Sequence, residues 1–116
     1  MIDSKILEFA QDISNYGLQN TSKKFASIKN KKCGDKIKVE LEVKNKIIKN
    51  MRYETESCIF CQASASVLAK HIKKNKLKNI KNLTSFKNFK FLLSKRYLSR
   101  KECVMLPIDA VKKAIK

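Results

Sequence analysis

The stretch Lys36-Ile37-Lys38-Val39-Glu40-Leu41-Glu42-Val43-Lys44 decides the fold class of this chain. Its apolar residues alternate with charged ones, which is the pattern of a β-strand with one face on a core and the other in solvent. Lys44-Asn45-Lys46 predicts a tight connection to a second strand, which runs from Ile47 towards Tyr53. The centre of the sequence therefore predicts an antiparallel hairpin.

Helical patterns flank this hairpin. Ile6, Phe9, Ala10 and Ile13 recur at helical spacing and predict an amphipathic helix over residues 4–16, capped by residue 3 or 4 and stopped at residue 17. Residues 18–32 show little periodicity and are predicted to form a loop. Together these elements indicate one α+β domain over residues 1–116, with a small antiparallel sheet covered by helices.

Three more helices are predicted after the hairpin. The small side chains of residues 63–69 favour a helix that begins after Cys58. A second helix is predicted around residues 86–93, with Thr84 or Ser85 as its cap. The last helix is predicted to follow Pro107, because proline is favoured in a first helical turn.

Composition narrows the class of protein. The formal net charge is +17, but the basic residues are mostly Lys and occur with abundant Asn and Ile, a bias that AT-rich coding produces by itself. Aromatic residues do not interleave with the basic ones, which argues against a nucleic-acid partner. The acid-free stretch from Lys70 to Lys101 leaves open a site for an acidic partner protein. No apolar run reaches the ~20 residues of a membrane span, and the N-terminus lacks secretory features, so we expect a cytoplasmic protein.

Four cysteines and one histidine favour metal or redox chemistry over disulfides in a reducing compartment. Cys33 with Asp35, Cys58 and Cys103 each stand where a loop or strand end is predicted to meet a regular element. Three thiolates and one carboxylate would close a tetrahedral zinc site or hold a cluster with one weaker ligand. The alternative is that the cysteines pack as small apolar side chains.

Two further residues have open roles. Cys61 completes a CxxC with Cys58, but the sequence lacks the preceding βαβ pattern of a thioredoxin-like motif. We expect Cys61 to point inward as a packing residue, with an alternative ligand or sulfur acceptor as the other reading. His71 is expected to lie on the surface or pack on its helix, not to bind metal.

Three ordered motifs resemble those of the U-type iron–sulfur cluster assembly scaffolds (IscU, SufU and the N-terminal domain of NifU). Cys33-Gly34-Asp35-Lys36-Ile37-Lys38-Val39 resembles the first motif, and the run from Cys58 to Ser66 the second. Cys103-Val104-Met105-Leu106-Pro107 resembles the third. The resemblance implies a three-stranded antiparallel sheet with helices packed on one side, as in SufE and IscU.

The resemblance also implies roles for single residues. Cys33, Cys58 and Cys103 correspond to the cysteines that ligate iron, a [2Fe–2S] cluster or zinc. Asp35 corresponds to the fourth ligand or to the residue that tunes cluster release. Cys103 is similar to the position that accepts persulfide sulfur from a cysteine desulfurase.

Two functions follow from the resemblance. In the first, the protein is a scaffold that binds iron or a [2Fe–2S] cluster and passes it to apo-proteins. In the second, it is a zinc-dependent sulfurtransferase of the SufU kind, with Arg100 and Cys103 as catalytic residues. Glu102 in place of the scaffold branch's His favours the second, as does Arg100, and the short span from Ser66 to Cys103 favours the first. A structural zinc domain with a basic binding face is a third reading.

Overall fold

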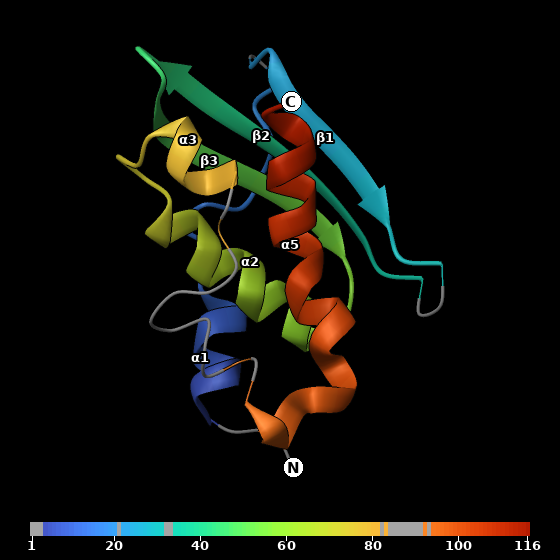
Figure 1. Cartoon of the computed structure of the whole chain (residues 1–116). Coiled ribbons are helices and arrows are strands. Elements are labelled where there is room, and N and C mark those ends of the chain that lie inside the picture. The colour runs from blue at the N-terminus through green and yellow to red at the C-terminus, as the bar shows by residue number, and fades with distance from the viewer. Residues whose placement is uncertain (1–3, 21, 32–33, 82, 84–91, 93) are drawn as a thin grey trace.

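The computed structural model describes residues 4–20, 22–31, 34–81, 83, 92 and 94–116 (Figure 1). Its elements, in chain order, are α1 (Ser4–Gln11), β1 (Lys24–Lys29), β2 (Lys36–Lys44), β3 (Ile47–Glu56), α2 (Ile59–His71), α3 (Leu77–Lys81), the 3-10 helix η1 (Lys95–Arg100) and α5 (Lys101–Ala114). Among the described residues, no helix is long and apolar enough to cross a membrane. The predicted helix around residues 86–93 lies largely outside the described residues. Leu92, which is described, is helical and fully buried.

The sheet has the order β1-β2-β3, and both pairs are antiparallel. The predicted central hairpin is confirmed, since β2 and β3 pair from Lys36–Glu56 to Lys44–Ile47. Asn45 and Lys46 make the tight connection with φ angles of 55° and 63°. This pair of positive φ angles is typical of the two-residue turn that matches the twist of a hairpin.

The predicted loop over residues 18–32 is wrong in part, because Lys24–Lys29 form β1. Ala26 pairs with Val39 of β2 and is buried, but its methyl group gives only a weak signal in the sequence. Phe25, the only aromatic residue of the strand, points to the other face and is 69% exposed. Pairing with β2, and not its own apolar pattern, makes this edge segment a strand.

Helices cover one face of the sheet, as predicted (Figure 1). α5 packs on β1 and β2, α2 packs on β3, and α1 packs on α2. α2 is buried on nearly all sides from Phe60 to Ala69. Its small side chains let α5 and the sheet approach closely, which explains the run of Ala and Ser in this helix.

The first helix is shorter than predicted and ends at Gln11. The Asp12 carboxylate accepts hydrogen bonds from the backbone N–H of Ser14 (3.0 Å) and from its hydroxyl, and it also pairs with Lys70. Such local bonds compete with helix continuation. The chain then runs beside the outer edge of β3, where the Gly17 N–H donates to the Tyr53 carbonyl (2.8 Å).

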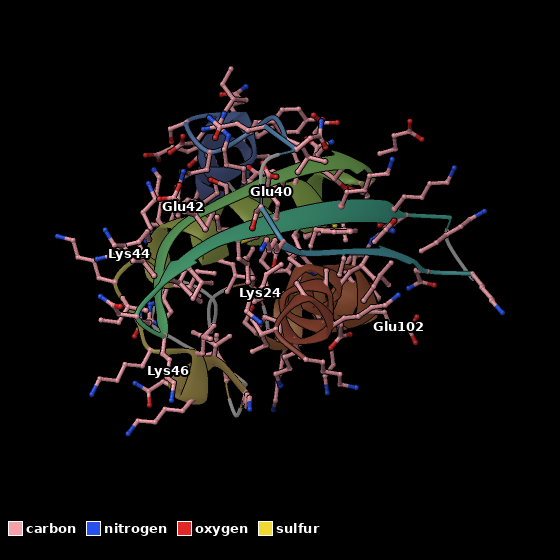
Figure 2. The ribbon with its side chains drawn as sticks, turned by 90° about the horizontal axis from the view of Figure 1, so that it is seen from above. Lys24, Glu40, Glu42, Lys44, Lys46 and Glu102 are labelled. Atoms are coloured by element: carbon pink, nitrogen blue, oxygen red, sulfur yellow. The ribbon has the colours of Figure 1, made fainter. Side chains whose placement is uncertain are left out.

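The outer face of the sheet is polar and carries part of this N-terminal segment. The Leu18 N–H donates to Glu54 (2.9 Å), and the Gln19 N–H donates to Glu40. Figure 2 shows Glu40 on the side of the sheet away from α5. These bonds explain why Glu40 is buried although the alternation of β2 places it on the solvent face.

The prediction that the last helix begins at Pro107 is wrong. α5 spans Lys101–Ala114, so Pro107 lies inside it and Cys103 lies in its first turn, not before it. A proline within a helix costs roughly 3 kcal/mol, since it has no N–H to donate. Val104, Leu106 and Pro107 are buried against the core, and this apolar burial offsets the cost.

Candidate metal centre

The first residue of the candidate metal centre, Asp35, lies immediately before β2. The loop before it is closed by two backbone hydrogen bonds of 2.8 Å, from Gly34 N–H to the Asn30 carbonyl and from Asn30 N–H to the Asp35 carbonyl. Gly34 has a φ of 78°, a conformation that glycine adopts without strain. The Asp35 side chain turns inward and is only 7% exposed. Cys33, the predicted ligand in this loop, lies outside the described residues.

Cys58 comes from the strand–helix junction. It occupies the position before the first residue of α2, with extended φ and ψ of −70° and 165°. Its carbonyl accepts the Gln62 N–H (3.2 Å), and its own N–H donates to Asp35 Oδ1 (3.3 Å). The half-buried thiol therefore lies at the helix N-terminus, where the helix dipole favours negative charge.

Cys103 comes from the first turn of α5 and is 5% exposed. The next residue in the chain is held to α2, because the buried Ser64 hydroxyl donates to the Val104 carbonyl (2.6 Å). Burial raises the pKa of the Cys103 thiol far above its usual range, and the neighbouring Cys58 and Asp35 raise it further. Apolar burial and nearby negative charge both disfavour the thiolate until a cation is present.

These three side chains converge on one point. A carboxylate oxygen of Asp35 and the sulfur atoms of Cys58 and Cys103 all lie within 4.8 Å of one another. Ligands held at about 2.3 Å around a tetrahedral ion lie about 4 Å apart, so this spacing fits a thiolate metal centre. Asp35 Oδ2 is buried and has no hydrogen-bond partner among the described residues. A buried carboxylate oxygen without a partner is costly unless a cation neutralises it.

Three other residues were considered in the sequence analysis, and the structure shows where each of them lies. The guanidinium of Arg100 lies 5.7 Å from the centre of the Phe60 ring. Cys61 is fully buried in the core, as expected for a packing residue. His71 is at the C-terminal end of α2, the end opposite Cys58, and its side chain is exposed. Burial lowers its pKa from the ordinary value.

Two residues that hold the segments of the centre in place were not identified by the sequence analysis. Ser64 joins α2 to α5, and its only signal in the sequence is its place in the small-residue run. Asn30 closes the loop before Asp35, and its side-chain amide donates to Glu102 (3.4 Å) on α5. Such links between segments distant in the sequence leave no mark on local periodicity.

Comparison of the sequence with known protein families identifies the family of this chain. The whole sequence, residues 1–116, matches the family described as the NifU-like N-terminal domain. The chain belongs to this family. The iron–sulfur cluster assembly scaffold family inferred from the three motifs is therefore confirmed.

Individual relatives agree with this membership. The chain is 26% identical over 140 aligned residues to the iron–sulfur cluster assembly scaffold protein IscU of Thermotoga maritima, covering 100% of this chain and 93% of that protein. Among solved structures, it is similar to a candidate scaffold for the SUF system from Fervidobacterium islandicum (TM-score 0.82, 22% identity, 99% and 96% of the two chains). It is also similar to the N-terminal part of a NifU-like protein from Brucella abortus (TM-score 0.83, 22% identity, 97% and 90%). These two likenesses establish the fold.

Proposed function

We propose that this protein is a scaffold that holds iron or a [2Fe–2S] cluster through Cys33, Asp35, Cys58 and Cys103 and passes the cluster to apo-proteins. The observation that carries the proposal is the convergence of Asp35, Cys58 and Cys103 from three separate elements within 4.8 Å. The unpartnered Asp35 oxygen supports it, because a cation would satisfy that oxygen. Membership in the scaffold family supports it independently.

The mixed donor set suits temporary binding. Thiolates are soft ligands that hold iron–sulfur clusters, whereas a carboxylate oxygen is a hard ligand. Asp35 keeps one hydrogen bond, from the Cys58 N–H to Oδ1, which orients the carboxylate towards the sulfur atoms. We propose that the bond between the Asp35 carboxylate and the metal is the one that breaks when the cluster is released.

The partner we propose as sulfur source is a cysteine desulfurase, with Cys103 as the acceptor of its persulfide sulfur. Cys103 lies in the first turn of α5, beside the lysine at position 101 and near the arginine at position 100. Positive charge at these two positions favours approach of an anionic persulfide. The lysines of α3 are not part of this positive charge. They lie towards the turn between β2 and β3, because the Leu77 N–H donates to the Lys46 carbonyl (3.0 Å).

The second candidate is the zinc-dependent sulfurtransferase. It is supported by the donor set, since three thiolates and one carboxylate also fit tetrahedral zinc. Arg100 supports it as well, since it immediately precedes α5 and is three residues before Cys103. In this function Cys103 would leave the metal, take sulfur from the desulfurase and carry it onward.

Anaerobic purification with metal and sulfide analysis tests both functions. Desulfurase, cysteine and ferrous iron are then added. Visible absorbance from a labile cluster with matching iron and sulfide is expected for a scaffold. One tightly held zinc, no cluster and faster desulfurase turnover would identify the sulfurtransferase. If metal removal unfolds the chain and the desulfurase is not stimulated, a structural zinc domain replaces both.

Variants of the ligands sharpen this test. Cys33→Ser, Cys58→Ser and Cys103→Ser should each abolish cluster binding and sulfur acceptance. Cys61→Ser should still bind metal, because its sulfur is buried in the core and is not one of the converging ligand atoms. Retention of cluster assembly in Cys103→Ser would contradict both functions.

A further inference from the structure

Cys58 and Cys61 form a dithiol at the start of α2. Cys58 occupies the cap position, and Cys61 is the third residue of the helix. Residues three positions apart at the start of a helix lie on the same side of it, with about 5–6 Å between their Cβ atoms. The metal centre uses Cys58 and leaves Cys61 without a role beyond packing.

The two thiols have contrasting surroundings. Cys58 is half-buried and faces Cys103 and Asp35, whereas Cys61 has no exposed surface. Cys61 Sγ lies 3.8 Å from Thr55 Oγ1, at the end of β3. Burial raises the pKa of the Cys61 thiol to about 11.

An accessible thiol beside a buried one suits thiol–disulfide exchange in two steps. An accessible thiol first takes up a sulfur substituent, and a neighbouring resolving thiol then displaces it. A second observation points to reactive chemistry beside Cys58, since Asp35, which is only 7% exposed and whose Oδ2 has no hydrogen-bond partner among the described residues, lies with Cys58 and Cys103 in one group of side chains.

We propose that Cys58 and Cys61 act as an internal reductant that converts persulfide sulfur into sulfide beside the metal ligands. The inference rests on the proposed function in one respect, since it assumes that sulfur arrives as a persulfide on Cys103. It goes beyond that function in assigning the two electrons that sulfide formation requires.

The first step is sulfur transfer between neighbouring cysteines. The Cys58 thiolate attacks the outer sulfur of a Cys103 persulfide. A bond forms between that sulfur and Cys58 Sγ, the bond to Cys103 Sγ breaks, and Cys103 leaves as a thiolate. The two Sγ atoms lie within 4.8 Å of each other, which is close enough for transfer of a single sulfur atom between them.

The second step is the reduction. Cys61 attacks Cys58 Sγ, a Cys58–Cys61 disulfide forms, and the bond to the outer sulfur breaks. The outer sulfur leaves as hydrosulfide and carries the proton of the Cys61 thiol. The two cysteine sulfurs together lose two electrons, and the outer sulfur gains them. An external dithiol then reduces the Cys58–Cys61 disulfide by exchange at the more accessible Cys58.

The test measures sulfide release in a single turnover without added reductant. The reduced protein, freed of metal, is mixed anaerobically either with desulfurase and cysteine or with glutathione persulfide. About one sulfide per chain is expected, together with a Cys58–Cys61 disulfide in the mass spectrum after thiol alkylation. Cys61→Ser should release sulfide at least about tenfold more slowly, because the neighbouring resolving thiol is lost.

Matched controls separate the possible outcomes. Cys61→Ala repeats the test in case serine disturbs the core, and Ser66→Cys restores the thiol count on the same helix without restoring the pair. Sulfide release from Cys61→Ser and Cys61→Ala at the wild-type rate would overturn the inference. If glutathione persulfide gives sulfide and the disulfide while the desulfurase gives neither, the inference stands and the proposed sulfur source fails.

Discussion

Replacing Asp35 with asparagine should make the metal-free protein more stable. The buried Oδ2 has no hydrogen-bond partner among the described residues, and an unsatisfied buried polar group costs about 1–3 kcal/mol. Asparagine keeps an oxygen that accepts the Cys58 N–H, but its amide meets mainly sulfur, a weak acceptor. The net gain is about 1–2 kcal/mol. For 116 residues this raises the melting temperature by roughly 4–8 °C.

With metal bound, the wild type should be more stable than Asp35→Asn. A ligand that binds only the folded state stabilises it in proportion to its affinity, and a charged carboxylate binds zinc more tightly than a neutral amide. Thermal denaturation of both proteins, with a chelator and with zinc, measures the two effects. Asp109→Asn on the exposed side of α5 is the control and should change stability by less than about 0.5 kcal/mol.

The outcome that refutes this reasoning is a metal-free Asp35→Asn that melts below the wild type. It would mean that the Asp35 carboxylate is already satisfied in the absence of a cation. Asp35→Ala tests the role in release separately. It should slow transfer of a bound cluster to an apo-protein, since the exchangeable oxygen ligand is gone, whereas faster loss of the cluster would contradict that role.

Three other predictions concern Cys103 and two side-chain bonds of α2. Cys103→Ser should end persulfide acceptance, which mass spectrometry of the protein after reaction with desulfurase and cysteine will show. Ser64→Ala should cost about 1 kcal/mol and weaken zinc binding, whereas Ser66→Ala, equally buried on α2 but bonded to Tyr53, should lose similar stability and bind zinc normally. Lys70→Met should cost at most about 1 kcal/mol at pH 7. Because Lys70 lowers the pKa of Asp12, the difference should fade as the pH drops below about 4, where Asp12 becomes protonated in the unfolded chain.

The sequence predicts well what depends on local pattern. β2 alternates strictly and is bounded by a turn whose residues accept positive φ, so the hairpin could be read directly. β1 could not, because its buried residue is an alanine and its phenylalanine faces outward. The edge strand β1 forms because β2 offers its backbone groups for hydrogen bonding. The residues of β1 alone therefore do not predict a strand.

The metal centre depends on a different kind of information. The candidate ligands stand in three motifs of the sequence, but the convergence of Asp35, Cys58 and Cys103 required the start of β2, the N-terminus of α2 and the N-terminus of α5 to share one end of the domain. For Cys103 the sequence was misleading, since a proline marks the usual beginning of a helix. The helix begins earlier, at Lys101, because burial of the segment on the core outweighs the proline. Cys103 is consequently fixed on a rigid helical turn, not on a loop. Because Cys103 is fixed in this way, we propose that Asp35, on the loop side of the centre, is the contact that opens for release.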